Sequence, residues 1–263
     1  MQRYHFVFTF ENSFSKSKAL MHIIKLDAID STNTFLKELA ANQYVENLTV
    51  VTTEHQTSGR GQRGSNWNTE PGKNLTFSIL IRNFLLEIEQ VYDLNVLITV
   101  SLHQFLSDLN LTNVAIKWPN DILSEKKKIA GVLIENQIKS QNEIVSIVGI
   151  GINVNQTNFE YLPHASSLQL LSLKNWNKEE ILLSFIEKLK FNLNRFTNDG
   201  SHIFWKYYRE ELFLKNKPAV FEDLLNGRFM GMIKDVTDSG LLQVELENEK
   251  ILNYSIKEIK LLY

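Results

Sequence analysis

The chain has 263 residues, a formal net charge of −2, 43% hydrophobic residues and no cysteine. This composition is typical of a globular protein and excludes a wholly disordered chain, disulfides, thiolate catalysis and cysteine-bound zinc. The slight negative charge argues against a general nucleic-acid binder. We find no secretory signal and no run near the roughly 18 apolar residues of a membrane helix, so we expect a cytoplasmic protein with no membrane partner.

The beginning of the chain differs in character from the remainder of the sequence. Residues 1–20 are aromatic and then rich in serine and lysine, which suggests an N-terminal extension with Met21 as a candidate native start. The pattern at 22–26 predicts a strand. The helix-capping residues 30–33 predict the start of a helix, and the β-branched run 48–53 predicts a second strand.

A polar, glycine-rich segment at 54–74 predicts a loop of a length that is uncommon unless the loop has a function. Within it, Gly59, Gly61 and Gly64 match the pattern G-x-G-x-x-G. We reject a dinucleotide-binding interpretation, because that motif should open a helix and turn-forming residues follow here. Glycine lets backbone N–H groups approach an anion, and Arg60 can grip a phosphate or a carboxylate. A solvated surface turn is the alternative interpretation.

The rest of the chain alternates predicted strands and helices before its character changes. Strands are expected at 75–81, 114–118, 131–138 and 144–154, and helices at 87–109, 179–196 and 202–212. Beyond residue 217 the sequence shows short alternating runs and turn signals, which indicate a small all-β module. The whole pattern predicts an α+β protein with a barrel-like C-terminal domain.

Three further segments are candidates for chemistry. Lys117-Trp118-Pro119-Asn120-Asp121 lies where a predicted strand ends, a frequent place for site residues. Lys128 adjoins an apolar strand and can point inward, whereas Lys126 and Lys127 are expected to be a solvated flank. The glycines of 149–155 suggest close approach of a ligand or of another backbone, and a tight sheet-packing contact is the alternative. The six histidines show no metal-ligand spacing, and the serine-hydrolase and Walker A motifs are missing.

Taken in order, these motifs resemble those of biotin protein ligases, also called biotin–[acetyl-CoA-carboxylase] ligases. The matching segments are residues 30–33, Gln56, 59–64, Trp67, 117–121, 128–131, 149–153 and 257–259. The resemblance covers about residues 22–263. It implies a catalytic domain at 21–214 with a mixed sheet akin to class II aminoacyl-tRNA synthetases, and an SH3-like domain at 215–263.

The resemblance also implies a two-step reaction. Biotin is first activated by ATP as biotinyl-5′-AMP with release of pyrophosphate, and the biotinyl group then passes to a lysine of a biotin carboxyl carrier domain. ATP with Mg²⁺ on its phosphates, biotin and the carrier protein are the implied partners. No nucleic-acid partner is expected, since about twenty residues before the first matched strand are too few for a helix-turn-helix domain. A homodimer formed through a sheet edge is one option for the assembly.

The resemblance assigns roles to individual residues. The implied catalytic residues are Lys128, Arg60 and Asp121. The implied biotin-binding residues are Ser31, Thr32, Asn33, Gln56, Gly59, Arg60, Gly61, Gln62, Lys128 and Gly131. The implied ATP- or adenylate-binding residues are Arg60, Arg63, Trp67, Lys117, Asn120, Lys128 and Asn153. No side-chain metal site is implied. Gln62 stands where the family often has arginine, which leaves open how tightly the adenylate is retained.

Two other functions stay open at this point. A lipoate–protein ligase of the same superfamily would catalyse related chemistry, although the loop at 59–67 fits the biotin pattern better. A non-catalytic biotin-sensing protein would need the same pocket, but the presence of both Lys128 and Arg60 favours catalysis.

Overall fold

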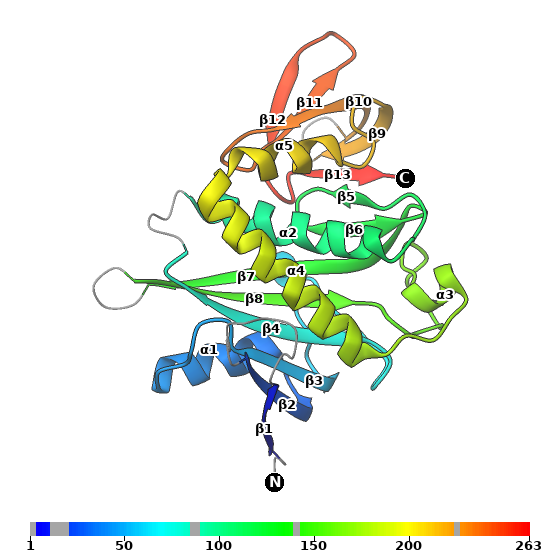
Figure 1. Cartoon of the computed structure of the whole chain (residues 1–263). Coiled ribbons are helices and arrows are strands. Elements are labelled where there is room, and N and C mark those ends of the chain that lie inside the picture. Colours follow the sequence, from blue (N-terminus) through cyan, green and yellow to red (C-terminus); the bar gives the residue numbers. More distant parts are fainter. Residues whose placement is uncertain (1–3, 11–20, 85–89, 139–142, 224–226) are drawn as a thin grey trace. The chain divides into compact units, whose positions relative to one another are not determined.

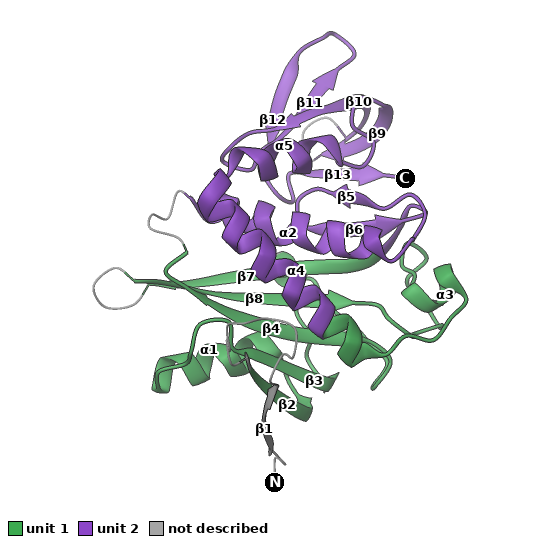
Figure 2. Ribbon diagram, in the orientation of Figure 1, with its two compact units in different colours: residues 1–88, 129–182 green, residues 89–128, 183–263 purple. Residues whose placement is uncertain are grey.

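The computed structural model describes residues 4–10, 21–84, 90–138, 143–223 and 227–263. The chain divides into two compact units, which Figure 2 colours separately. Unit 1 comprises Met1–Ile88 and Ile129–Leu182, and unit 2 comprises Glu89–Lys128 and Leu183–Tyr263. Unit 2 thus groups the C-terminal β module with an earlier stretch of the chain. The domain boundaries expected after residues 20 and 214 remain a prediction.

Unit 1 is built on a mixed sheet (Figure 1). Its strands lie in the order β1 (Tyr4–Phe10), β2 (Met21–Ile29), β3 (Val50–Gln56), β4 (Leu75–Arg82), β8 (Ile144–Ile152) and β7 (Lys127–Ile138). Strands β2 and β3 run parallel, and the other neighbouring pairs run antiparallel. The sheet and the helices beside it confirm the predicted α+β class.

The helical segments of unit 1 include α1 (Thr32–Asn42), the short 3₁₀ turn η1 (Gln62–Gly64), α3 (Leu168–Ser172) and the first turn of α4 (Lys178–Asp199). Ser31 caps α1, and the apolar face of the helix buries Leu36 and Ala40 completely or nearly so. These two residues share one core cluster with sheet residues that include Val51 and Leu80. Burial of this face fixes the N-terminus of α1 beside the sheet.

Unit 2 combines helices with a hairpin and a second sheet. It contains α2 (Val91–Asp108), the rest of α4, α5 (His202–Glu210), and the hairpin of β5 (Ala115–Lys117) and β6 (Asp121–Ser124). The second sheet has the order β12 (Ile251–Tyr254), β11 (Leu242–Leu246), β10 (Gly227–Val236), β9 (Pro218–Asp223) and β13 (Ile259–Leu262). Its neighbouring strands all run antiparallel, so the predicted C-terminal β module is confirmed.

Several local expectations need correction. Glu54–Gln56 were expected in the loop but extend β3, because β2 continues to pair with them up to the match of Ile29 with Gln56. Strand β6 was not predicted, since the expected strand stopped at Pro119 and the chain reverses there instead. Strand β7 begins at Lys127, ahead of the predicted residue 131, and the short helix α3 was missed.

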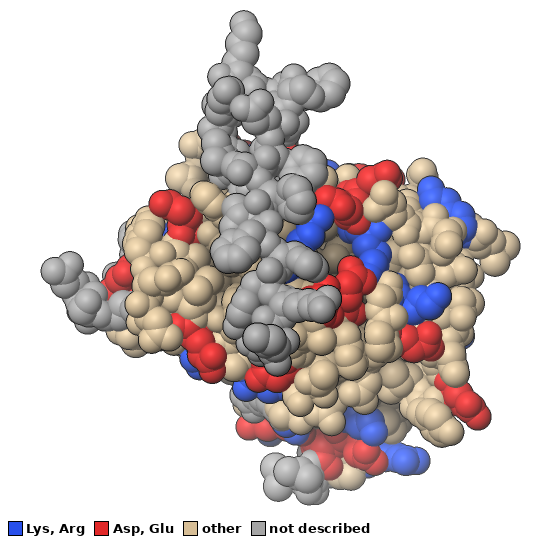
Figure 3. All heavy atoms as spheres, turned by 90° about the horizontal axis from the view of Figure 1, so that it is seen from below, with Lys and Arg blue, Asp and Glu red and all other residues tan. Residues whose placement is uncertain are grey.

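On the face shown in Figure 3, the side chains of Lys and Arg are interspersed with those of Asp and Glu. This mixture of signs agrees with the nearly balanced charge of the sequence. Among the described helices, none combines the length and the apolar character that crossing a bilayer requires.

Candidate active site

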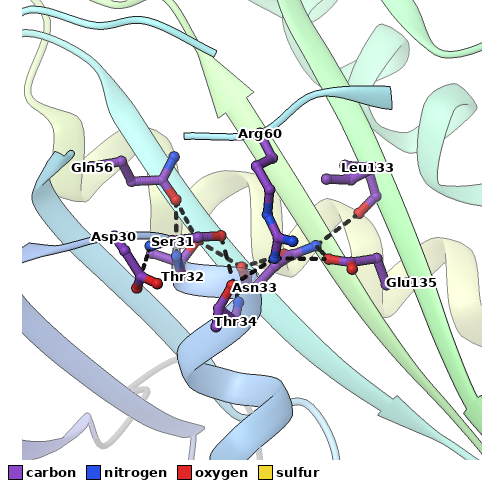
Figure 4. A network of polar contacts seen from close by, with 10 residues as sticks. Asp30, Ser31, Thr32, Asn33, Thr34, Gln56, Arg60, Leu133 and Glu135 are labelled. Atoms are coloured by element: carbon purple, nitrogen blue, oxygen red, sulfur yellow. Dashed lines mark hydrogen bonds and ion pairs between the residues drawn. The ribbon is translucent and has the colours of Figure 1, made fainter. Parts of the chain in front are cut away.

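The first group of site residues lies at the N-terminus of α1 (Figure 4). The Ser31 hydroxyl accepts a hydrogen bond from the backbone N–H of Thr34 at 3.4 Å, as an N-cap does. The backbone N–H and the hydroxyl of Thr32 both donate to Oε1 of Gln56, at 2.8 and 3.1 Å. Parallel pairing places Gln56 opposite Ile29, just before the helix begins. The end of β3 and the start of α1 are therefore joined by side chains.

Asn33 connects the same helix to the middle of the sheet. Its Nδ2 donates to Oε2 of Glu135 at 2.8 Å and to the carbonyl of Leu133 at 3.4 Å. Its Oδ1 accepts from the Ser78 hydroxyl at 2.6 Å. A Cβ at position 149 would overlap the Asn33 amide, so Gly149 leaves the space that this side chain fills. The buried amide of Asn33 is thereby hydrogen-bonded at both ends.

Arg60 reaches this network from the glycine-rich loop. Its Nη2 donates to the Thr34 hydroxyl at 2.5 Å and lies 3.9 Å from Oε2 of Glu135. The Arg60 side chain is 49% exposed and that of Glu135 is 25% exposed. A guanidinium that is held by these contacts and is still half exposed can also bind an anionic ligand.

The loop that carries Arg60 folds back on itself. The backbone N–H of Trp67 donates to the Gly59 carbonyl at 2.9 Å, and that of Gly61 donates to the Ser65 carbonyl at 2.6 Å. A Cβ at position 151 would overlap the Trp67 indole, so Gly151 allows that ring to lie against β8. The side chains of Trp67 and Asn33 therefore approach these strand glycines closely, and close approach of a ligand there remains a prediction.

The other predicted residues of unit 1 lie around these two clusters. Gln62 opens the turn η1, and the side chain of Arg63 lies outside the described residues. Gly131 is paired with Gly151 across β7 and β8. Asn153 is buried and its Nδ2 donates to the Ser166 carbonyl at 2.9 Å, so part of its amide supports the chain beyond β8.

Unit 2 holds a second group, at the hairpin of β5 and β6. Lys128 Nζ lies 2.7 Å from Oδ1 of Asp121, with side-chain exposures of 33% and 20%. Lys117 is the cross-strand partner of Asp121, and facing partners on a hairpin share one side of it. The Asp121 carboxylate is thus ion-paired with Lys128, and Lys117 is its backbone partner across the hairpin. Asn120, next to it, is buried.

The turn before Asp121 is held from several directions. The Trp118 indole N–H donates to the Gly240 carbonyl at 3.0 Å. The carbonyl of Pro119 accepts from the Tyr208 hydroxyl at 2.8 Å and from Nδ2 of Asn95 at 3.1 Å. Burial raises the pKa of the Tyr208 hydroxyl well above its ordinary value, which keeps it a donor. These bonds fix the backbone from which Lys117 and Asp121 project.

Sequence reasoning missed some members of both groups. Glu135 and Ser78 connect Asn33 to the sheet, and Tyr263 lies over Lys117 with its ring centroid 4.9 Å from Nζ. Glu135 and Ser78 are polar residues in otherwise apolar runs, IAGVLIE and LTFSILI, and that contrast was an available signal. Tyr263 carried no such signal. Among the described residues no cluster of three or more His, Asp or Glu side chains could hold a metal.

Comparison with known proteins identifies the family. Residues 26–155 match the model of the biotin/lipoate A/B protein ligase family. The chain is 30% identical over 235 residues to the bifunctional ligase/repressor BirA of Bacillus spizizenii, covering 86% of this chain and 70% of that protein. It is 26% identical to the biotin–[acetyl-CoA-carboxylase] ligase of Mycobacterium tuberculosis, covering 84% of this chain and 82% of the relative.

A solved structure agrees with these relatives. The biotin protein ligase of Aquifex aeolicus in complex with biotin and ATP superposes with a TM-score of 0.74 at 27% identity, covering 91% of this chain and 98% of that one. The chain therefore belongs to the biotin/lipoate A/B protein ligase family and is a biotin protein ligase.

Proposed function

We propose that this ligase activates biotin with ATP and transfers the biotinyl group to a lysine of a biotin carboxyl carrier domain, such as that of acetyl-CoA carboxylase. The observation that carries the proposal is the network at the start of α1, where Thr32, Asn33, Gln56 and Arg60 meet. Polar side chains fixed by one another beside a half-exposed cation suit a ligand with a polar head and an anionic tail.

Biotin has such a head, because its ureido group carries N–H donors and a carbonyl acceptor that need partners when buried. Oε1 of Gln56 accepts from Thr32, and no hydrogen bond of its Nε2 is found among the described residues, so we assign the Nε2 donors to the ureido carbonyl. The Ser31 hydroxyl accepts from Thr34 and can donate its own proton. Ser31 and Gln56 are therefore assigned to hydrogen-bond the head of biotin. Thr32 and Asn33, which the resemblance also assigns to biotin, would line the head and hold these partners in place through their own hydrogen bonds.

Activation brings two anions together. The biotin carboxylate attacks the α-phosphorus of ATP, a new P–O bond forms, and the bond to the departing pyrophosphate breaks. At about 4 Å and an effective dielectric near 20, each pair of unit charges repels by about 4 kcal/mol. Arg60 and Lys128 are assigned to offset this repulsion, and Lys117 to the phosphates of ATP.

Transfer needs a neutral amine. The neutral amine of the carrier lysine attacks the carbonyl of biotinyl-5′-AMP, the C–N bond forms, the C–O bond to AMP breaks, and the amine loses a proton to water as AMP leaves. Asp121 is assigned to orient that amine, and its carboxylate is already held by Lys128 at 2.7 Å. A Mg²⁺ that accompanies ATP would be bound by oxygens of its phosphates and of water. Association into a homodimer remains a prediction.

The test compares biotin with lipoate and then follows the chemistry. Biotin at 100 times its Kd should stabilise the folded chain by about 2.7 kcal/mol, measured by thermal unfolding, and lipoate should not. Mixing biotin with ATP should release pyrophosphate, and a carrier domain added afterwards should gain the mass of one biotinyl group. Stabilisation by lipoate alone would indicate a lipoate ligase. Biotin binding without pyrophosphate release would indicate a sensor.

A further inference from the structure

Tyr263 lies beside the charged residues of the β5–β6 hairpin. It follows β13, which is held in the second sheet by pairing with β9 up to the match of Leu262 with Val220. The Tyr263 ring meets the ring of Phe213 edge-on, with the centroids 5.1 Å apart. The sheet therefore holds the backbone just before Tyr263, and the contact with Phe213 restricts its ring.

The ammonium of Lys117 lies over this ring, 4.9 Å from its centroid. That distance is within the range of a cation–π contact. The carboxylate nearest in sequence, Asp121, is engaged by Lys128 at 2.7 Å. Among the described side chains no carboxylate forms an ion pair with Lys117, so the aromatic face is what holds its charge in place.

The phenol of Tyr263 stays neutral in this environment. Burial raises its pKa, Asp121 raises it further, and Lys128 acts in the opposite direction. A neutral phenol adds no charge to the site, and the contact with Lys117 depends on the face of the ring.

We propose that Tyr263 is a positioning residue for Lys117, and that through Lys117 it sets the affinity of the ligase for the phosphates of ATP. The inference rests on the proposed function, in which Lys117 binds ATP. A flexible lysine loses rotamer freedom when it binds an anion, and a ring that already restricts the ammonium reduces that loss. The second sheet would thus contribute to nucleotide binding through one aromatic side chain.

The experiment measures KM for ATP, KM for biotin and kcat of biotin-dependent pyrophosphate release. Tyr263→Leu should raise KM for ATP about 2- to 30-fold, the range of a cation–π contact, with kcat and KM for biotin unchanged. Tyr263→Phe keeps the aromatic ring and should therefore show the wild-type KM for ATP. Tyr263→Met keeps apolar bulk against Phe213 and serves if the Leu variant does not fold.

A double variant tests whether the effect passes through Lys117. Lys117→Met alone should raise KM for ATP, and adding Tyr263→Leu should raise it no further. Tyr254→Leu is the matched control, because Tyr254 packs on Phe229 with a centroid distance of 6.4 Å. It should lower the melting temperature without changing KM for ATP.

The outcomes separate this inference from the proposed function. Additive effects of the two substitutions, an equal rise in KM for biotin, or a normal KM in Lys117→Met would overturn the role of Tyr263 while the ligase reaction stands. Absence of pyrophosphate release from the wild-type protein would overturn both.

Discussion

Lys128 is the residue whose removal should affect chemistry far more than folding. Its ion pair with Asp121 is one-third exposed on the lysine side, and pairs open to solvent contribute only about 0–1 kcal/mol to stability. Lys128→Ala should lower the rate of biotin-dependent pyrophosphate release by about 100-fold or more, as loss of a charge-stabilising donor does. The melting temperature should change little.

The same lysine run supplies the control for this variant. Lys127 is exposed and immediately precedes Lys128, so Lys127→Ala removes an equal charge from the same segment. It should leave the rate of pyrophosphate release near that of the wild type. If Lys128→Ala also turns over at the wild-type rate, the catalytic assignment of Lys128 is wrong.

Glu135 offers a test of how the Asn33 network stabilises unit 1. Glu135→Leu removes the 2.8 Å acceptor of the buried Asn33 amide, which should lower the free energy of unfolding by about 1–3 kcal/mol. Glu135→Gln retains an oxygen acceptor and loses only the charge that faces Arg60 at 3.9 Å. Its cost should be about 0–1 kcal/mol. Urea unfolding measures both, and equal destabilisation by the two variants would contradict the network.

At the scale of residues, the sequence identified which residues belong to the candidate site but not which of them contact one another. The capping cluster at 30–33 and Gln56 were singled out from their motifs, and the structure brings them together. That Asn33 donates to Glu135, or that Tyr263 covers Lys117, depends on pairings between segments far apart in the chain. Local periodicity carries no information about such pairings.

At the scale of elements, the predictable parts were those with strong patterns. Strand β4 was found because its run is almost entirely buried and apolar, and α1 because its cap and its apolar spacing agree. Strand β6 was not predicted, because Pro119 was taken as the end of the preceding strand. In the structure the chain turns at Trp118–Pro119 and β6 returns antiparallel to β5. The few residues of α3 are too short a window for a helical period.

The packing of α5 on α2 makes stability depend on pH. Burial lowers the pKa of His103, with an opposing backbone contact to Val114, and the ring lies 3.0 Å from the Tyr207 hydroxyl. In the unfolded chain the His103 imidazole takes up a proton near pH 6.5, whereas burial in the folded chain disfavours its protonated form. The free energy of unfolding should therefore fall as pH decreases through about 6.5, by up to about 1.4 kcal/mol per pH unit.

A histidine variant isolates this effect. Glu211 acts in the opposite direction, because burial and Glu210 raise its pKa and it then favours the folded state as pH falls. Urea unfolding at pH 7.5 and 5.5 should show a smaller loss for His103→Gln than for the wild type. The exposed His202 is the control, and His202→Gln should keep the wild-type loss. An unchanged loss in His103→Gln would rule out His103 as its source.

At the scale of the whole molecule, the residues proposed for the head of biotin and those of the charged β5–β6 group fall in different units. The residues assigned to the head of biotin belong to unit 1, and Lys117, Asp121 and Lys128 belong to unit 2. Hydrogen exchange can follow each unit separately, because a ligand slows only those local openings that release it. This separation predicts that biotin and ATP protect different segments of the same chain.

Biotin alone should slow exchange at amides of α1 and at the end of β3, where the Thr32 N–H is bound to Gln56. A non-hydrolysable ATP analogue should slow exchange in the β5–β6 hairpin. If Tyr263 positions Lys117, the analogue should also slow exchange in β13, and Tyr263→Leu should remove that protection while leaving the effect of biotin on α1. At 100 times Kd the expected slowing corresponds to about 2.7 kcal/mol. Equal protection of α1 and β13 by biotin alone would contradict this division, because no residue assigned to biotin's head lies in unit 2.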